Sequence, residues 1–156
     1  MIKVEPLTTE RFAPFGQVFE TPGGPARDYF SDALANRRPQ ARPSLSMAYR
    51  APTPLPLRAT MMERHKFSSQ TFIATAAGRW LVLAAPHHPS GGPDMTEARA
   101  FLPGPGQGIT FGADVWHHPL TVFDRPGTFA IYMWLDGTNG DEEFFALPEP
   151  LSIDLR

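Results

Sequence analysis

The chain has 156 residues and a formal charge of -2, from 14 basic and 16 acidic residues. We expect one domain over 1–156, because this length fits a single core, and no nucleic-acid partner, because the charges are balanced. No apolar run approaches the roughly 18 residues of a membrane span, and the start lacks a signal-peptide core, which predicts a cytoplasmic protein with no membrane partner. The absence of cysteine excludes disulfides, thiolate metal sites and a cysteine nucleophile.

One short helix is predicted near the start of the chain, with Thr8 as its N-cap, Glu10 in its first turn and Gly16 as its stop. Beyond it, the 18 Pro and 13 Gly gather mainly in 21–25, 39–56, 86–93 and 103–108. Proline and glycine interrupt long helices and mark turns, so we interpret these clusters as surface loops. The basic group of Arg37, Arg38 and Arg42 is expected to lie in such a loop, exposed to solvent.

Short runs rich in aromatic and β-branched residues stand between these clusters, at 70–76, 80–85, 109–111, 129–135 and 151–155. Such lengths and compositions are typical of strands. Several short strands at near-regular spacing predict an all-β sandwich or barrel with few short helices.

Two segments about fifty residues apart carry three of the five histidines and suggest a site. On a strand, Glu63 and His65 point to the same face, roughly 7 Å apart. A bend at 67–69 would bring Gln70 beside them, and His117 would have to arrive from a third strand. Imidazole and carboxylate are ligands for a divalent metal. Equally, Glu63 and His65 could be a surface pair, and 116–119 could hold a buried structural histidine.

The neighbouring residue His118 should point away from His117 if their strand is regular. It could be catalytic, structural or part of an interface, and the sequence leaves open which of the two histidines faces the cavity. The pair at 87–88 stands among prolines and glycines, which indicates an exposed loop outside the site.

The spacing resembles the two cupin motifs in a degenerate form. Glu63 stands in the place of the first histidine of motif one, followed by His65, Gln70 and Gly78. The turn before the histidine of motif two is similar to 112–117.

Over its whole length the chain resembles the ureidoglycolate lyase family, also called ureidoglycolate hydrolase. The matching pieces are Val4 to Thr8, Phe12, Phe15-Gly16, Tyr49 to Pro52, Leu55 to Leu57, Glu63 to His65, Gln70 to Ile73, Trp116 to Leu120 and Asp136-Gly137. The chain departs from the family at Lys66, where a proline is usual, and over 21–43. The resemblance implies a cupin-like antiparallel β-barrel or sandwich and an enzyme that cleaves ureidoglycolate to glyoxylate and urea in allantoin breakdown. It also implies a homodimer, and exposed barrel edges invite such pairing.

That reaction needs a general base and a general acid, because a hydroxyl proton is removed and the leaving nitrogen is protonated. We expect Glu63, His65, His117 and His118 to be catalytic. A weakly bound Ni, Mn or Zn ion would be held by Glu63, His65, His117 and Gln70. Arg50 would pair the substrate carboxylate, and Asp136 would bind substrate, orient a histidine or turn the chain. The alternatives are a cupin-like enzyme for another small hydroxy acid or sugar derivative, and a cupin-like binder of small molecules without turnover.

Overall fold

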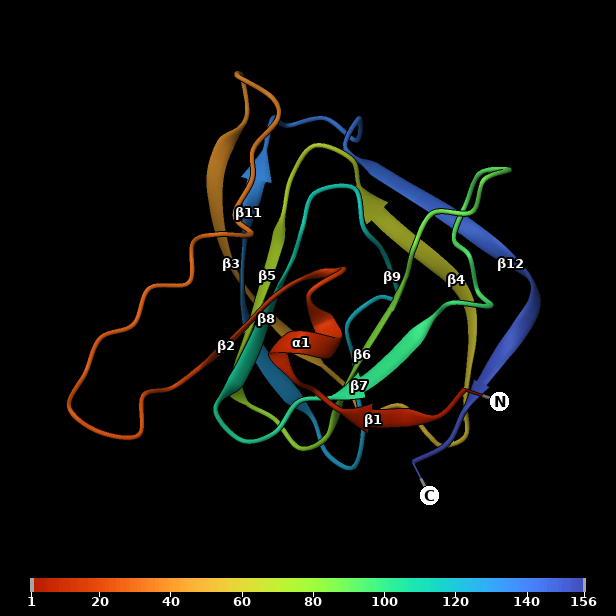
Figure 1. Cartoon of the computed structure of the whole chain (residues 1–156), viewed down its shortest axis with the longest axis horizontal. Helices are drawn as coiled ribbons and strands as arrows, with labels where there is room; N and C mark the ends of the chain where they lie inside the picture. The colour runs from red at the N-terminus through yellow and green to blue at the C-terminus, as the bar shows by residue number, and fades with distance from the viewer. Residues whose placement is uncertain (1, 156) are drawn as a thin grey trace.

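The structure, a computed structural model, describes residues 2–155 and consists mainly of β-strands (Figure 1). Helix α1, Thr9–Phe12, begins after Thr8, whose hydroxyl accepts a hydrogen bond from the backbone nitrogen of Arg11 at 3.3 Å. The predicted N-cap is therefore confirmed. The helix ends before Gly16, which opens a strand, and no helix within 2–155 has the length and apolarity needed to cross a membrane.

The first sheet has seven strands. Its path is β1-β7-β6-β9-β4-β12, and β10 pairs separately with β6. The bounds are β1 Val4–Pro6, β4 Leu57–His65, β6 Trp80–Ala85, β7 Arg99–Leu102, β9 Trp116–His117, β10 Thr121–Val122 and β12 Glu142–Ile153. Neighbours are antiparallel except for the parallel pair of β1 and β7.

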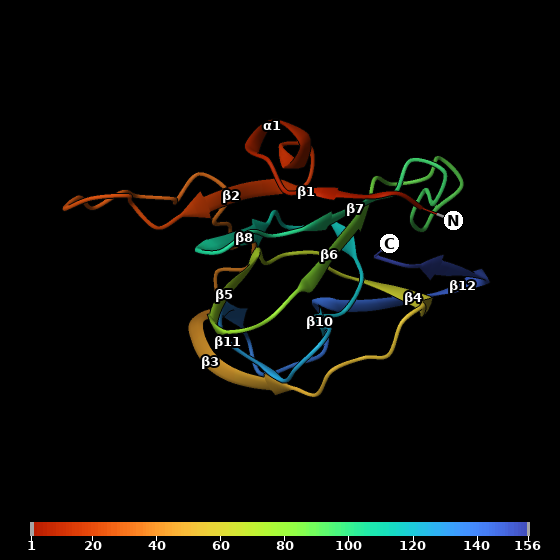
Figure 2. The same cartoon turned by 90° about the horizontal axis from the view of Figure 1, so that it is seen from below.

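The second sheet has five strands in the order β2-β8-β5-β11-β3, all antiparallel. Its members are β2 Gly16–Glu20, β3 Arg42–Arg50, β5 Gln70–Ala76, β8 Gln107–Phe111 and β11 Gly127–Leu135. The segment between β2 and β3 reaches out from the sheets in both views (Figures 1 and 2).

The two sheets pack face to face and form a sandwich, with α1 beside β1 and β2 (Figure 2). The layer between them is a buried apolar cluster rich in aromatic rings, among them Phe12, Phe72, Trp80, Phe101, Phe111 and Phe129. A second cluster, which includes Met62, Leu83 and Trp116, lies on the other face of the first sheet. Strand β6 is therefore buried along its whole length, which explains its continuous apolar sequence.

The all-β class and the strands predicted at 70–76 and 80–85 are confirmed, and those at 109–111 and 129–135 lie within β8 and β11. The final run at 151–155 is the end of a longer strand, which stops at Ile153.

The interpretation of every proline cluster as a loop was wrong for 42–50, which forms β3. Pro43 is tolerated because β3 is the edge strand of its sheet. Pro148 and Pro150 likewise lie in β12, at the irregularity between Ala146 and Leu151, where the pairing with β4 shifts.

The prediction that Arg38 is exposed was also wrong, because the side chain is buried between two carboxylates. Arg37 is exposed, as predicted, and so is Arg42.

Candidate active site

Three strands from the two sheets bring four of the predicted site residues together. Glu63 and His65 come from β4, and His117 comes from β9 in the same sheet. Glu63 and His117 are direct cross-strand partners, and His117 is also paired with Ala84 of β6. Gln70 is the first residue of β5 in the facing sheet. The predicted arrival of His117 from a third strand is confirmed.

The polar atoms of these four residues converge. His117 Nε2 lies 3.4 Å from Glu63 Oε1 and 3.1 Å from Gln70 Oε1. The rings of His65 and His117 have centroids 5.7 Å apart. One donor atom each from Glu63, His65 and His117 lies within 4.8 Å of the other two, so these three side chains can share one small ligand. We call these three residues and Gln70 the cluster.

The imidazole of His117 is held on both sides. Its ring stacks on Phe111 of β8, with centroids 4.2 Å apart and planes 16° apart. Its Nδ1 lies 2.9 Å from the carbonyl oxygen of Val115. A carbonyl can only accept, so we assign the proton to Nδ1, which leaves a lone pair on Nε2.

That lone pair points to a place where Glu63 and Gln70 already present oxygen atoms. Three acceptors that meet in a buried space repel one another unless a proton or a cation lies between them. The donor set, two imidazoles, one carboxylate and one amide oxygen, suits a divalent transition metal.

Burial and mutual contact set the protonation of the cluster. Burial lowers the pKa of His65 below its ordinary 6.5, and the charge of His117 adds to this, whereas Glu63, Asp141 and Gln70 oppose it. Burial by itself would raise the pKa of Glu63. When His117 is protonated on both nitrogens, its hydrogen bond to Glu63 and the positive charges of the surrounding histidines outweigh this effect, and they lower the pKa of Glu63 below the ordinary 4.5. A neutral imidazole and an ionised carboxylate are the forms that bind metals.

His118 follows the end of β9 and is not one of the converging donors. Its Nδ1 contacts the carbonyl of Pro119 at 3.0 Å and the hydroxyl of Thr121 at 3.2 Å, and its backbone nitrogen donates to Leu83. Burial lowers its pKa from 6.5, against the opposing effects of the Pro119 carbonyl and the Glu63 charge. The structure therefore places His117 in the cluster and His118 beside it.

The two remaining predicted residues lie elsewhere. Arg50 is exposed and pairs with Gly127 at one end of β11, whereas Gln70 pairs with Met133 near the other end. Since Met133 in turn pairs with Ser44, six residues along β3 separate Arg50 from the level of the cluster, about 20 Å at 3.3 Å per residue. Arg50 is therefore too far from the cluster to bind a substrate carboxylate there, and that expectation is corrected.

Asp136 does not join the cluster. One of its oxygens accepts hydrogen bonds from the backbone and hydroxyl of Thr138, and the other lies 3.0 Å from Arg38 Nη1. Of the roles predicted for Asp136, the structure shows the one in which it turns the chain.

The residue behind His65 is Asp141, which the sequence did not single out. Its Oδ2 lies 3.9 Å from His65 Nδ1. The available signal was weak, because Asp141 is the first of three consecutive acidic residues, and such runs are usually solvated faces.

On the outer face of the first sheet, Arg64 lies between the two cluster residues of β4 and points away from them. Its guanidinium lies over the ring of Trp116, 4.7 Å from the centroid, and pairs with Asp114 and Glu143. Trp116 also donates to His87 at 3.2 Å. These contacts tie β9 to β4 from outside and support the pairing of Glu63 with His117.

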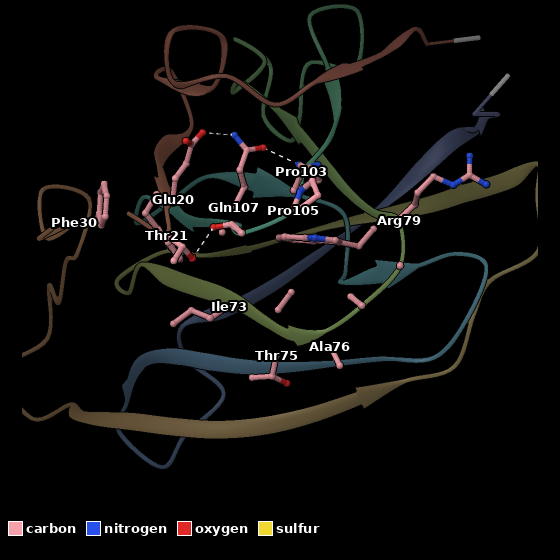
Figure 3. A pocket seen from close by; sticks show the side chains of 18 of the residues that line it. Glu20, Thr21, Phe30, Ile73, Thr75, Ala76, Arg79, Pro103, Pro105 and Gln107 are labelled. Atoms are coloured by element: carbon pink, nitrogen blue, oxygen red, sulfur yellow. Dashed lines mark hydrogen bonds between the residues drawn. The ribbon is translucent and has the colours of Figure 1, made fainter. Parts of the chain in front are cut away.

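A separate groove of about 800 Å³ lies at the other end of β5 and β8 (Figure 3). Its walls include Thr21, Phe30, Ile73, Arg79, Pro103 and Gln107, and none of the cluster residues. Among the described residues, its lining holds no histidine, and two of its charged groups are already engaged: Glu20 accepts a hydrogen bond from the Gln107 amide at 2.6 Å, and Arg79 pairs with Asp124. The groove therefore does not compete with the cluster as the reactive site.

The chain is similar to known proteins along nearly its whole length. Residues 1–154 match the family model described as ureidoglycolate lyase. A protein of Mesorhizobium japonicum named ureidoglycolate lyase is 39% identical, over 93% of both chains, and one of Azotobacter vinelandii with the same name is 34% identical, over 98% of this chain and 97% of that one. The ureidoglycolate lyase of Pseudomonas aeruginosa is 37% identical, over 98% of this chain and 95% of that one.

A solved structure of similar fold is the dTDP sugar isomerase of Desulfovibrio desulfuricans. It is 15% identical with a TM-score of 0.51, and the match covers 86% of this chain and 83% of that one. At this identity the likeness concerns the fold alone, and it agrees with the cupin-like sandwich.

Proposed function

The chain belongs to the ureidoglycolate lyase family, and from this premise we propose that the cluster is where it cleaves ureidoglycolate to glyoxylate and urea. The observation that carries the proposal is the convergence of Glu63, His65 and His117 donor atoms within 4.8 Å. It joins a carboxylate to two imidazoles, the groups that most often transfer protons in enzymes.

The reaction moves one proton across one carbon. A base removes the hydroxyl proton of the carbinolamide, the C–O bond becomes a carbonyl, and the C–N electron pair leaves with the nitrogen, which takes up a proton to give urea. In the site without a metal, we assign the first transfer to Glu63 and His117, whose Oε1 and Nε2 are 3.4 Å apart and can hold one proton between them. The same pair can return that proton to the leaving nitrogen. His65 completes the pocket as a neutral imidazole.

The proposal also has a form with a divalent metal, in which the same atoms would be ligands instead of proton carriers. The acceptors around His117 Nε2 fit a cation, and Glu63, His65, His117 and Gln70 would hold it. When bound, such an ion acts as a Lewis acid that lowers the pKa of a coordinated hydroxyl. A neutral amide is a weak ligand, so we expect loose binding.

Release of urea and glyoxylate tests the proposal. Purified protein is treated with a chelator and assayed with ureidoglycolate, alone and with added Ni(II), Mn(II) or Zn(II). We expect both products in equal amounts and a higher rate with one of the metals. A His88→Ala variant, in the exposed 86–93 loop, serves as the control and should retain the activity. No product under any of these conditions would overturn the proposal, and equal rates with and without metal would remove its metal component.

We further propose that the protein is a homodimer that packs through the outer face of the second sheet. Edge strand β3 exposes Leu45, Met47 and Tyr49 to 72%, 66% and 64%. The neighbouring strands add Tyr132 beside Leu45 and the 43% exposed Ile73. Apolar residues that gather over three adjacent strands are typical of an interface, and a second copy would cover them symmetrically.

Light scattering should give twice the 17.3 kDa of one chain. Met47→Glu should shift the mass toward that of a monomer, because a charge would be buried in the interface. Ser90→Glu, in an exposed loop, is the control and should leave the mass unchanged. A monomeric wild type would contradict the proposal.

A cytoplasmic location belongs to the same set of proposals. A carboxylate substrate does not cross an apolar bilayer unaided, so the enzyme should reside where ureidoglycolate is formed. Cell fractionation with the product assay tests this.

A further inference from the structure

Asp141 lies at the turn that leads into β12 and forms hydrogen bonds with the residues that follow β4. Its Oδ1 accepts a hydrogen bond from the backbone nitrogen of Phe67 at 2.6 Å, and its carbonyl accepts one from Lys66 at 2.9 Å. The next residue, Glu142, is the cross-strand partner of His65. The carboxylate is thereby fixed behind the His65 ring.

The second oxygen of Asp141 has no hydrogen-bond partner within residues 2–155. Oδ2 is buried and lies 3.9 Å from His65 Nδ1, just beyond hydrogen-bond range. A buried acceptor without a donor costs free energy. His65 Nδ1 is the ring nitrogen nearest to it, and a shift of about 1 Å would bring the two atoms into hydrogen-bond range.

Arg38 supplies the positive charge that a buried carboxylate needs. Its Nη2 lies 3.4 Å from Asp141 Oδ2 and donates to the carbonyl of Trp134 at 3.0 Å. Arg38 and Asp141 are only 7% and 4% exposed. The carboxylate can therefore remain charged beside a neutral imidazole.

We propose that Asp141, held by Arg38, is a positioning residue that keeps the proton of His65 on Nδ1 and so presents the Nε2 lone pair to the cluster. Carboxylates behind histidines fix the tautomer and ring orientation in this way and make the other nitrogen a better ligand or base. Asp141 does not touch the reacting atoms in this scheme. The inference deepens the proposed function, but it can be tested without substrate.

Nitrogen-15 NMR of the imidazoles is the direct test, because it distinguishes the two neutral tautomers. At pH 8, in chelator, we expect His65 of the wild type to carry its proton on Nδ1. A wild-type His65 protonated on Nε2 would overturn the proposal, whatever the activity.

Asp141→Asn retains an oxygen for the Phe67 backbone but can turn only an amide N–H toward His65. We expect His65 to move to the Nε2 protonated form and affinity for added Ni(II) or Mn(II) to fall about 10- to 100-fold, the range for losing such a partner. Glu143→Gln is the control. Glu143 lies two residues after Asp141 and pairs with Arg64, so the change removes a nearby carboxylate that does not face His65. It should leave the His65 tautomer unchanged.

The outcomes separate the two proposals. An Asp141→Asn protein that retains the Nδ1 tautomer would overturn the positioning role even if the lyase assay succeeds. A shifted tautomer in a protein without lyase activity would support the positioning role and count against the proposed function. If Asp141→Asn does not fold, the wild-type spectrum decides.

Discussion

Glu63 and His117 face each other across the β4–β9 pair, and the shortest contact between a carboxylate and an imidazole in the cluster joins them at 3.4 Å. The stack on Phe111 fixes the plane of the His117 ring, and a half-turn within that plane, which would move Nε2 away from Glu63, would break the contact of Nδ1 with the Val115 carbonyl. The pair is therefore held in a geometry suited to sharing one proton or one ligand.

Replacing His117 should harm turnover more than replacing His118. His117→Ala removes Nε2 from the cluster, and we expect a fall of at least about 100-fold, the usual scale for a positioned proton-transfer group. His118→Ala should cost less, because its ring contacts Pro119 and Thr121 rather than the converging donors. The measurement is kcat for urea and glyoxylate release.

His88→Ala is the matched control for both variants and should stay near wild type. Circular dichroism would show that each variant retains the sheet structure. Loss of activity in His118→Ala with little change in His117→Ala would exchange the roles of the two histidines.

Neutralising Glu63 should weaken metal binding. Glu63→Gln keeps the shape of the side chain but replaces one oxygen with an amide, which can donate to His117 Nε2 and relieve the convergence of acceptors. We expect affinity for Ni(II) or Mn(II) to fall at least about 10-fold in titration calorimetry, by comparison with the loss of outer partners. Glu142→Gln, an exposed carboxylate opposite His65, should bind metal as the wild type does. Equal metal affinities for the wild type, Glu63→Gln and Glu142→Gln would show that the metal binds elsewhere.

The sequence predicted the central part of the site because its spacing is local. Glu63 and His65 are two residues apart on one strand, and alternate residues of a strand point to the same face. The bend after them returns the chain to Gln70, so one strand and one turn bring three side chains together. The position of His117 required the resemblance to a family, since nothing local brings β9 beside β4.

Contacts that depend on distant pairing were not predicted. Arg38 and Asp141 come from an irregular segment and a turn that meet only when β11, β12 and β4 are assembled, and as sequence they resemble ordinary solvated charges. Strand β3 was missed for a related reason. Pro43 and the prolines that flank the strand indicate a loop, and only the edge position of β3 in the completed sheet makes Pro43 acceptable.

Acid should destabilise the metal-free protein through its buried histidines. The pKa values of His65 and His118 lie below 6.5 in the folded state, mainly because of burial. Unfolded chains protonate histidine near that value, so as the pH falls below about 6.5 the unfolded state takes up protons that the folded state does not, and the free energy of unfolding decreases. Each such group can contribute at most about 1.4 kcal/mol per pH unit.

Urea unfolding in chelator at pH 7.5 and 5.5 measures this dependence. His118→Gln should lose less stability between the two pH values than the wild type, because one of the groups is gone. An unchanged pH dependence would show that His118 does not contribute. Glu63 affects stability in a separate pH range, below its ordinary pKa of 4.5. Its pKa is lowered in the folded state, so the stability that the ionised carboxylate contributes is lost as the pH falls through that range.

Removing Arg38 should destabilise the fold far more than removing its neighbour. Arg38→Met leaves the buried Asp141 carboxylate and the Trp134 carbonyl without their shared partner. Breaking a buried ion pair from one side typically costs about 3–5 kcal/mol, because the remaining charge is uncompensated. Arg37→Met is the matched control. Arg37 is exposed, and its backbone nitrogen donates to the Phe67 carbonyl, a hydrogen bond that methionine retains. Its cost should stay within about 0.5 kcal/mol. Urea unfolding at pH 7.5 measures both, and a loss below about 1 kcal/mol for Arg38→Met would mean that Asp141 does not depend on Arg38 for its charge balance.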